Sequence, residues 1–170
     1  VDAVAVSVTE FNADATTTLV SDAAQSDLSA GTDLVLRSVA GALTLNDGAD
    51  ADGVAVSAAG RVLLGAGGDL LVDADVRGTG GDVTLKAAQG IALAAGVNVD
   101  ASATASLDAQ AGALTMAGTA AVNGSSVRLQ AGTDVVLGNV SGTGVSVVAG
   151  GAILNAEGST VNVSGGSLRL

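Results

Sequence analysis

The sequence predicts an all-β fold, a right-handed parallel β-helix (β-solenoid) of about six or seven coils with ~20 residues each. Short apolar triplets recur at a fixed period, because Leu85, Leu107 and Leu129 follow one another at intervals of 22 residues. Hydrophobic residues make up 48% of the chain, but Phe11 is its single aromatic residue, so a core would consist of small aliphatic side chains. Such side chains suit a thin interior in which each layer repeats the one below, whereas globular cores usually rely on aromatic groups. Short crossovers between parallel strands indicate a β-helix, and right-handed crossovers are the default.

Residues 1–30 form a separate N-terminal segment, because all 25 glycines lie between Gly31 and the C-terminus. Valine alternates with small or polar residues over 4–9, which predicts a strand with one buried face. Thr16–Val20 is expected to form a second strand, followed by a polar loop over 22–27. We expect this segment to be a cap or an irregular first coil. Pairing with the edge of the solenoid and donation of a strand to a neighbouring molecule stay open as alternatives.

The β-helix repeats are expected to fill residues 31–170. The predicted starts of the coils are Leu34, Val54, Val62, Val83, Ala105, Val127 and Val145. Val54 and Val62 lie too close together for a full coil, so one of these starts is misplaced or an insertion is present. The last strand is expected at Ser167–Leu170. Within each triplet the outer residues are apolar and the middle residue varies, as expected if the middle residue points to solvent. These middle residues include Thr44, Thr84, Thr115, Arg128, Ser146 and Arg169.

The main structural alternative is a helix over Ala101–Ala121, because alanine is the best helix former. Gly112 and Gly118 interrupt this stretch, and it lies in register with strand-like repeats on both sides. We therefore favour strands here.

The charge balance excludes several classes of partner. Six basic and 17 acidic residues give a net charge of −11, which would repel nucleic acid and anionic membranes. The sequence contains no run of 18 apolar residues, the length that a transmembrane helix needs, so we expect no membrane insertion. The chain contains no cysteine, so we expect neither disulfides nor thiol chemistry. The sequence starts at Val1 with no basic n-region, so we expect any signal peptide to have been removed or never to have been part of it.

Aspartates precede several strand triplets and have two interpretations. They are Asp33, Asp69, Asp82 and Asp134. We favour a role as turn residues whose carboxylates accept backbone hydrogen bonds. A cation-binding β-roll is the alternative, but spacings of 36, 13 and 52 residues give no continuous ladder of carboxylates. The acidic residues that could hold a weakly bound calcium ion are Asp47, Asp50 and Asp52, and the pair Asp73 and Asp75. A solvated loop is the favoured alternative for both groups.

No catalytic constellation emerges, so we expect no enzyme and no cofactor. Polysaccharide lyases and glycosidases need convergent carboxylates with a base or cation, but the chain has no histidine or tyrosine and its basic residues are spread singly. The threonines at middle positions could form an ice-binding array, but Arg128, Ser146 and Arg169 interrupt them. Asn123, Asn139 and Asn162 match the short glycosylation acceptor pattern.

The stretch Gly80–Ser102 (GGDVTLKAAQGIALAAGVNVDAS) and its echo at 131–137 (AGTDVVL) resemble the filamentous-haemagglutinin-type repeats of large bacterial exoproteins. The resemblance covers roughly Gly31–Leu170. It implies a right-handed parallel β-helix at the bacterial surface or outside the cell, with the role of a shaft in adhesion or cell-to-cell contact. The secretion domain of that family carries an Asn-Pro-Asn-Gly type motif, and this chain contains no proline, so we expect that domain to be absent.

We therefore expect a non-catalytic structural segment of a bacterial cell-surface adhesin or of a self-assembling extracellular fibre. Its expected partners are further repeats or other copies joined end to end, and a glycan or protein of a cell surface. The alternative is a carbohydrate- or calcium-binding surface module that uses the Asp-rich turns.

Overall fold

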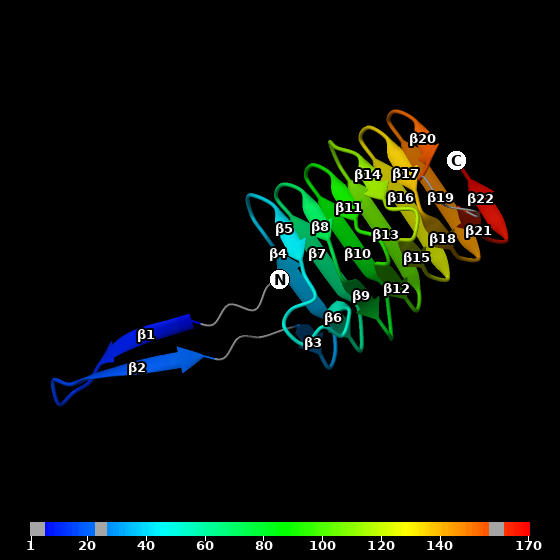
Figure 1. Cartoon of the computed structure of the whole chain (residues 1–170). Coiled ribbons are helices and arrows are strands. Elements are labelled where there is room, and N and C mark those ends of the chain that lie inside the picture. The colour runs from blue at the N-terminus through cyan, green and yellow to red at the C-terminus, as the bar shows by residue number, and fades with distance from the viewer. Residues whose placement is uncertain (1–5, 23–26, 157–161) are drawn as a thin grey trace.

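The structure, a computed structural model, describes residues 6–22, 27–156 and 162–170 (Figure 1). Every regular element in these ranges is a β-strand, and the strands form one antiparallel hairpin and three parallel sheets. Successive coils stack behind one another, and each supplies one strand to each parallel sheet (Figure 1). The predicted parallel β-helix is confirmed. The helical alternative over Ala101–Ala121 is wrong, since this stretch contains the strands Thr104–Ala109 and Leu114–Met116, and the strands that flank it end at Ala101 and begin at Ala121.

Each sheet contains the corresponding strands of successive coils in chain order. The first sheet consists of β4 (Leu34–Arg37), β7 (Val62–Ala66), β10 (Val83–Ala87), β13 (Thr104–Ala109), β16 (Ser126–Ala131), β19 (Gly144–Ala149) and β22 (Ser167–Arg169). The second sheet consists of β5 (Leu43–Leu45), β8 (Leu70–Val72), β11 (Ile91–Leu93), β14 (Leu114–Met116), β17 (Val135–Leu137) and β20 (Ile153–Asn155). The third sheet consists of β3 (Leu28–Ala30), β6 (Val54–Ala58), β9 (Asp75–Gly78), β12 (Asn98–Ala101), β15 (Ala121–Asn123), β18 (Asn139–Ser141) and β21 (Val163–Ser164).

The register of the first sheet gives the length of each coil. The residues in register are Leu34, Val62, Val83, Ala105, Val127, Val145 and Leu168, so the six intervals are 28, 21, 22, 22, 18 and 23 residues. This is roughly consistent with the predicted six or seven coils. Val54 was wrongly expected to start a coil, because it lies in β6 of the third sheet. An insertion is present as well, since the longest coil contains the extended connection 46–53 between β5 and β6.

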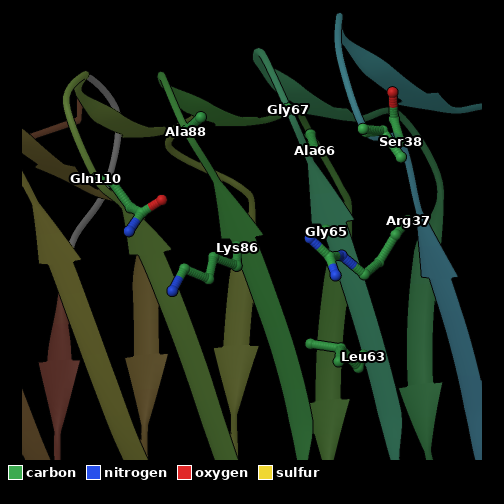
Figure 2. A pocket seen from close by; sticks show the side chains of 10 residues that line it. Arg37, Ser38, Leu63, Gly65, Ala66, Gly67, Lys86, Ala88 and Gln110 are labelled. Atoms are coloured by element: carbon green, nitrogen blue, oxygen red, sulfur yellow. The ribbon is translucent and has the colours of Figure 1, made fainter.

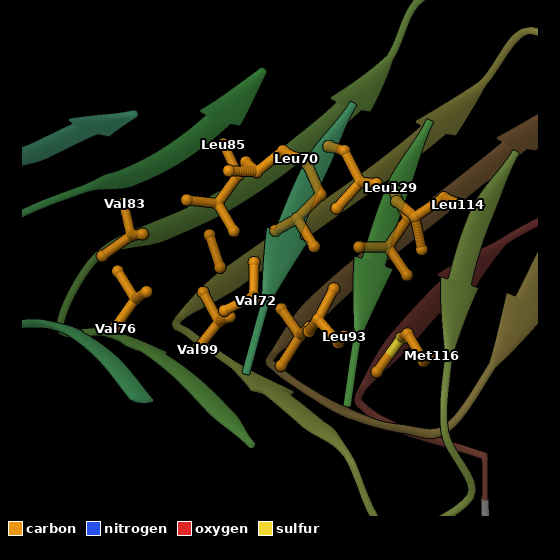
Figure 3. Close-up of a cluster of buried hydrophobic side chains, with 14 of the residues drawn as sticks. Leu70, Val72, Val76, Val83, Leu85, Leu93, Val99, Leu114, Met116 and Leu129 are labelled. Atoms are coloured by element: carbon orange, nitrogen blue, oxygen red, sulfur yellow. The ribbon is translucent and has the colours of Figure 1, made fainter. Parts of the chain in front are cut away.

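The core is a set of aliphatic columns that run through the stack. Inward and outward residues alternate along the strands; in β10, for example, Leu85 is fully buried and Lys86 is exposed. Because the register is maintained, Leu85 lies over Leu64 and under Leu107. Figure 3 shows leucine and valine side chains from different strands meeting in the interior. Burying each such side chain contributes about 1.5–3 kcal/mol, and stacking like on like fills every layer without aromatic groups.

Close contact between coils explains some of the glycines. A Cβ atom at Gly112 would lie 2.6 Å from the backbone nitrogen of Gly90 in the preceding coil, which no side chain can tolerate. By contrast, a Cβ atom at Gly144 would have no neighbour within 4 Å. Glycine at position 112 is therefore required by the spacing of the coils rather than by a special backbone conformation.

The N-terminal hairpin contains β1 (Val6–Phe11) and β2 (Thr17–Asp22), which pair with each other. Both predicted strands are confirmed, although Val4 and residues 23–26 of the predicted loop lie outside the described residues. β3 pairs with β6, so the parallel sheet begins before Gly31. The expectation that residues 1–30 cap the solenoid or are donated to a neighbour stays a prediction. Among the described residues no helix is long and apolar enough to cross a membrane.

Candidate functional site

The four recurrent aspartates all bind the next coil. Their Oδ1 atoms accept backbone N–H groups in the pairs Asp33–Arg61 (2.8 Å), Asp69–Gly90 (2.8 Å), Asp82–Thr104 (2.9 Å) and Asp134–Ala152 (2.7 Å). In each pair the donor is the residue in register with the aspartate, one coil further along the chain. The predicted role as hydrogen-bond acceptors is confirmed, but the donors lie on a neighbouring coil rather than in the same turn.

Parallel-sheet geometry explains why an aspartate is needed at these corners. In a regular ladder the amide of Gly90 would bind the carbonyl that precedes Asp69, which is that of Gly68. That carbonyl already accepts the amide of Gln89, at 3.1 Å. The carboxylate of Asp69 supplies the missing acceptor, while the amide of Leu70 binds the carbonyl of Gly90 at 2.9 Å.

An aspartate carboxylate replaces the backbone acceptor at the other three corners as well. There the carbonyl before the aspartate already accepts another amide: Thr32 accepts Gly60 (2.9 Å), Gly81 accepts Ala103 (3.2 Å) and Thr133 accepts Gly151 (2.8 Å). The aspartates thus extend the ladder by one bond where the backbone turns away. They belong to two different sheets, with Asp33 and Asp82 before the first and Asp69 and Asp134 before the second, so they form no column of carboxylates.

Within the part of the chain that the structure describes, two aspartates form ion pairs with arginine. Asp33 lies 2.8 Å from the guanidinium of Arg61 on the exposed surface, and hydrogen bonds from the side chain and amide of Arg61 lower the pKa of the Asp33 carboxyl. Asp75 is buried and binds Arg77 at 2.7 Å and the amide of Asn98 at 2.7 Å. Both carboxylate oxygens of Asp75 are thus engaged. The alternative in which Asp73 and Asp75 hold a cation therefore finds no free oxygen on Asp75. The favoured expectation of a solvated loop is wrong for Asp75, which is buried in β9.

The acidic loop brings together three carboxylates from two segments. Asp50 and Asp52 of the connection 46–53 meet Asp27, which directly precedes β3, and one oxygen of each lies within 4.8 Å of the others. The carboxylate of Asp47 instead accepts the amide of Gly53, at 2.6 Å. Two of the three residues suggested as a calcium-binding alternative, Asp50 and Asp52, thus lie together, and Asp47 does not belong to the group. Asp27 was missed, and only the pairing of β3 with β6 would have shown that it lies near the loop.

The carboxylates of this acidic loop repel one another. The Oδ1 atom of Asp27 is buried and has no hydrogen-bond partner among the described residues. Burial raises the pKa of the Asp27 carboxyl, and the negative charges of Asp50, Asp52 and Asp47 raise it further. A cation held by oxygen ligands would satisfy the orphaned atom and relieve this repulsion.

The threonines do not form one array. Thr84 lies in β10 of the first sheet, whereas Thr44 and Thr115 lie in β5 and β14 of the second sheet. The neighbours of Thr115 in its row are Ala92 and Val136. The expected interruption of a threonine array is confirmed, because the middle residues belong to two separate faces.

The three glycosylation acceptor motifs lie on or beside the third sheet, where their amides bind other coils. Nδ2 of Asn123 donates to Asp100 at 2.7 Å, Nδ2 of Asn139 to the carbonyl of Gly118 at 3.1 Å, and Nδ2 of Asn162 to the carbonyl of Leu137 at 2.7 Å. The nitrogen that a glycan would modify therefore already carries a structural hydrogen bond in all three.

A groove of about 510 Å³ lies on the outer face of the first sheet (Figure 2). Arg37, Lys86 and Gln110 contribute polar side chains to it, and the side chain of Arg37 lies across Gly65, where a Cβ atom would be 3.3 Å from the Cγ atom of Arg37. Sequence reasoning did not place these residues together, because they belong to different coils. Comparison with protein-family models, with curated proteins and with solved structures gave no match for this chain.

Proposed function

We propose that this chain is a non-catalytic structural segment, the β-solenoid shaft of a bacterial surface adhesin or of a self-assembling extracellular fibre. The proposal rests on the hydrogen bonds that aspartate side chains form between neighbouring coils. Asp33, Asp69, Asp82 and Asp134, which an enzyme or a calcium β-roll would need free, act as acceptors that tie each coil to the next. Together with the aliphatic columns, these bonds favour a mechanical role.

The repeating geometry also favours extension of the stack. Each coil presents the same ladder register and the same inward columns to the following one. A further coil, from the same chain or from a second copy, would therefore find matching hydrogen bonds and a matching apolar layer. The resemblance to filamentous-haemagglutinin-type repeats supports the same assignment and a location at the cell surface.

Two measurements test this proposal. Sedimentation velocity and negative-stain microscopy over a range of concentrations should show end-to-end rods if the chain is a fibre subunit. Immunogold labelling of the source cells should place it on the outer surface. Labelling confined to the cell interior would overturn the proposal, and a monomer at every concentration would eliminate the fibre version and leave the adhesin shaft.

Calcium binding at Asp27, Asp50 and Asp52 is a second candidate function. It is favoured by the orphaned Oδ1 atom of Asp27 and by the raised pKa of this carboxyl. Calorimetric titration with calcium should give saturable heat that the double variant Asp50→Asn/Asp52→Asn removes. Asp73→Asn is the matched control, because Asp73 is exposed and lies outside the cluster. Absence of heat for the unmodified chain at millimolar calcium would exclude the site.

A further inference from the structure

The basic residues of this acidic protein gather on one face. Four of the six lie in strands of the first sheet, and their side chains are exposed on its outer face; these are Arg37, Lys86, Arg128 and Arg169. Asp108 is the one acidic residue of these strands. Four positive charges and one negative charge give the face a formal charge of +3, within a chain whose net charge is −11.

The four charges are evenly spaced along the stack. They occupy β4, β10, β16 and β22, which are every second strand of the first sheet. At the usual spacing of parallel strands, neighbouring charges are therefore about 9–10 Å apart along the solenoid. Arg37 and Lys86 share one row with Gly65 between them, and Arg128 and Arg169 share another with Ser146 between them.

These charges are available to a ligand. Both described ion pairs use other arginines, Arg61 and Arg77, and neither involves this face. Arg128 donates a hydrogen bond to Gln130 on the same strand. Figure 2 shows Arg37 extending across Gly65 and Lys86 extending in the same direction, along the floor of the groove.

The spacing and the absence of aromatic groups define the ligand. Single-stranded nucleic acids are usually held by bases that stack on aromatic rings, and the first sheet contains no aromatic residue. The remaining charge of the chain also repels a dense phosphate polymer. A linear acidic polysaccharide is less densely charged, because an uncharged sugar separates its carboxylates. The basic side chains of this face are likewise separated, by two strand spacings of about 9–10 Å in total.

We propose that the outer face of the first sheet binds a linear acidic polysaccharide with carboxylates on alternate sugars, laid along the stack of coils. Each basic side chain pairs with one carboxylate, and the groove that Arg37, Lys86 and Gln110 line accommodates the uncharged sugar between two charged ones. This inference is independent of the proposed shaft function, because it concerns side chains that support neither the core nor the ladder.

The test measures binding of hyaluronate fragments, in which uronate and neutral sugars alternate, by calorimetry in low-salt buffer. The methyl ester of the same fragments is the uncharged control, and single-stranded DNA of similar length is the competing polyanion. We expect binding of the free acid alone, weakened by added salt because exposed charges are screened. Equal binding of the ester, equal or tighter binding of DNA, or no binding of the free acid would each overturn the proposal.

Variants locate the binding face. Replacing all four basic residues by glutamine should weaken binding by between about fourfold and several hundredfold, since each exposed ion pair contributes roughly 1.4- to 5-fold. Arg37→Gln should weaken binding and Asp108→Asn should strengthen it, whereas Arg77→Gln on the third sheet should leave it unchanged. Circular dichroism and the Tm check that each variant is folded. Unchanged binding by the folded four-residue variant, or an equal loss in Arg77→Gln, would place the ligand elsewhere.

Discussion

Removal of the Asp134 carboxylate tests the role of the corner aspartates most directly. Asp134 is half-buried, and its Oδ1 atom accepts the amide of Ala152 at 2.7 Å. The carbonyl of Thr133 cannot replace it, because it already binds the amide of Gly151 at 2.8 Å. Asp134→Ala therefore leaves an amide of the sixth coil without a protein acceptor.

The expected cost follows from the strength of such a bond. A hydrogen bond to a charged acceptor contributes about 1.5–3 kcal/mol, and exposure of Ala152 lets water recover part of this. We expect Asp134→Ala to lower the free energy of unfolding by about 1–2 kcal/mol, which corresponds to about 2–8 °C in Tm for a chain of this size. Asp134→Asn keeps an oxygen at the same place and should cost less than half as much.

Urea denaturation followed by circular dichroism provides the measurement. Asp73→Ala is the matched control, because it removes the same charge from an exposed position and should change stability by less than about 0.5 kcal/mol. The control is needed because removing any acidic residue relieves repulsion in a chain of net charge −11. If Asp134→Ala and Asp73→Ala are equally stable, the carboxylate does not complete the ladder and the interpretation of all four corners is refuted.

Three further predictions concern packing and pH. Gly112→Ala should destabilise the protein by about 1–3 kcal/mol in urea, because its Cβ atom would overlap Gly90, whereas Gly144→Ala should be neutral or stabilising. Leu107→Ala should cost about 2–5 kcal/mol, because it opens a cavity in a fully buried column; a cost below 1 kcal/mol would contradict the columnar core. Because the pKa of Asp27 is raised in the folded state, protonation of this carboxyl stabilises the fold. This stabilisation is complete below pH 3.8, the ordinary pKa, and is lost as the pH rises through the raised pKa. Asp27→Asn should therefore have a higher Tm than the unmodified chain at neutral pH and an equal Tm below pH 3.8; a lower Tm at neutral pH would contradict the repulsion in the cluster.

The fold could be predicted because the leucines of one sheet recur in register. The positions Leu85, Leu107 and Leu129 are vertical neighbours in the first sheet, so their sequence period is the length of a coil. The assignment of triplets to faces could not be predicted in the same way. Strands of all three sheets use the same apolar–variable–apolar pattern, so Val54 looked like the start of a coil although it lies on the third sheet.

The candidate sites depend on neighbours that are distant in sequence. Asp27 joins Asp50 and Asp52 only because β3 pairs with β6 across the longest coil. The basic face combines residues from alternate coils, and its charges look isolated when the chain is read in order. The corner aspartates were identifiable as acceptors, since a turn residue with a carboxylate has few other roles, but their donors required the register of the next coil.

The connection at 46–53 shows where this architecture tolerates change. Coils of 18 to 28 residues occupy equivalent places in the stack, and the longest one contains this loop. The ladder of β5 with β8 before the loop is in register, and the ladder of β6 with β9 after it absorbs an irregularity between Val54 and Val56. Inserted sequence at this corner would add a loop-closure cost that grows slowly with length, provided that the bond from the amide of Asp75 to the carbonyl of Gly53 is kept. The lineage can therefore acquire new peptide epitopes here, and an engineer can graft a foreign peptide here, without redesigning the coil above or below.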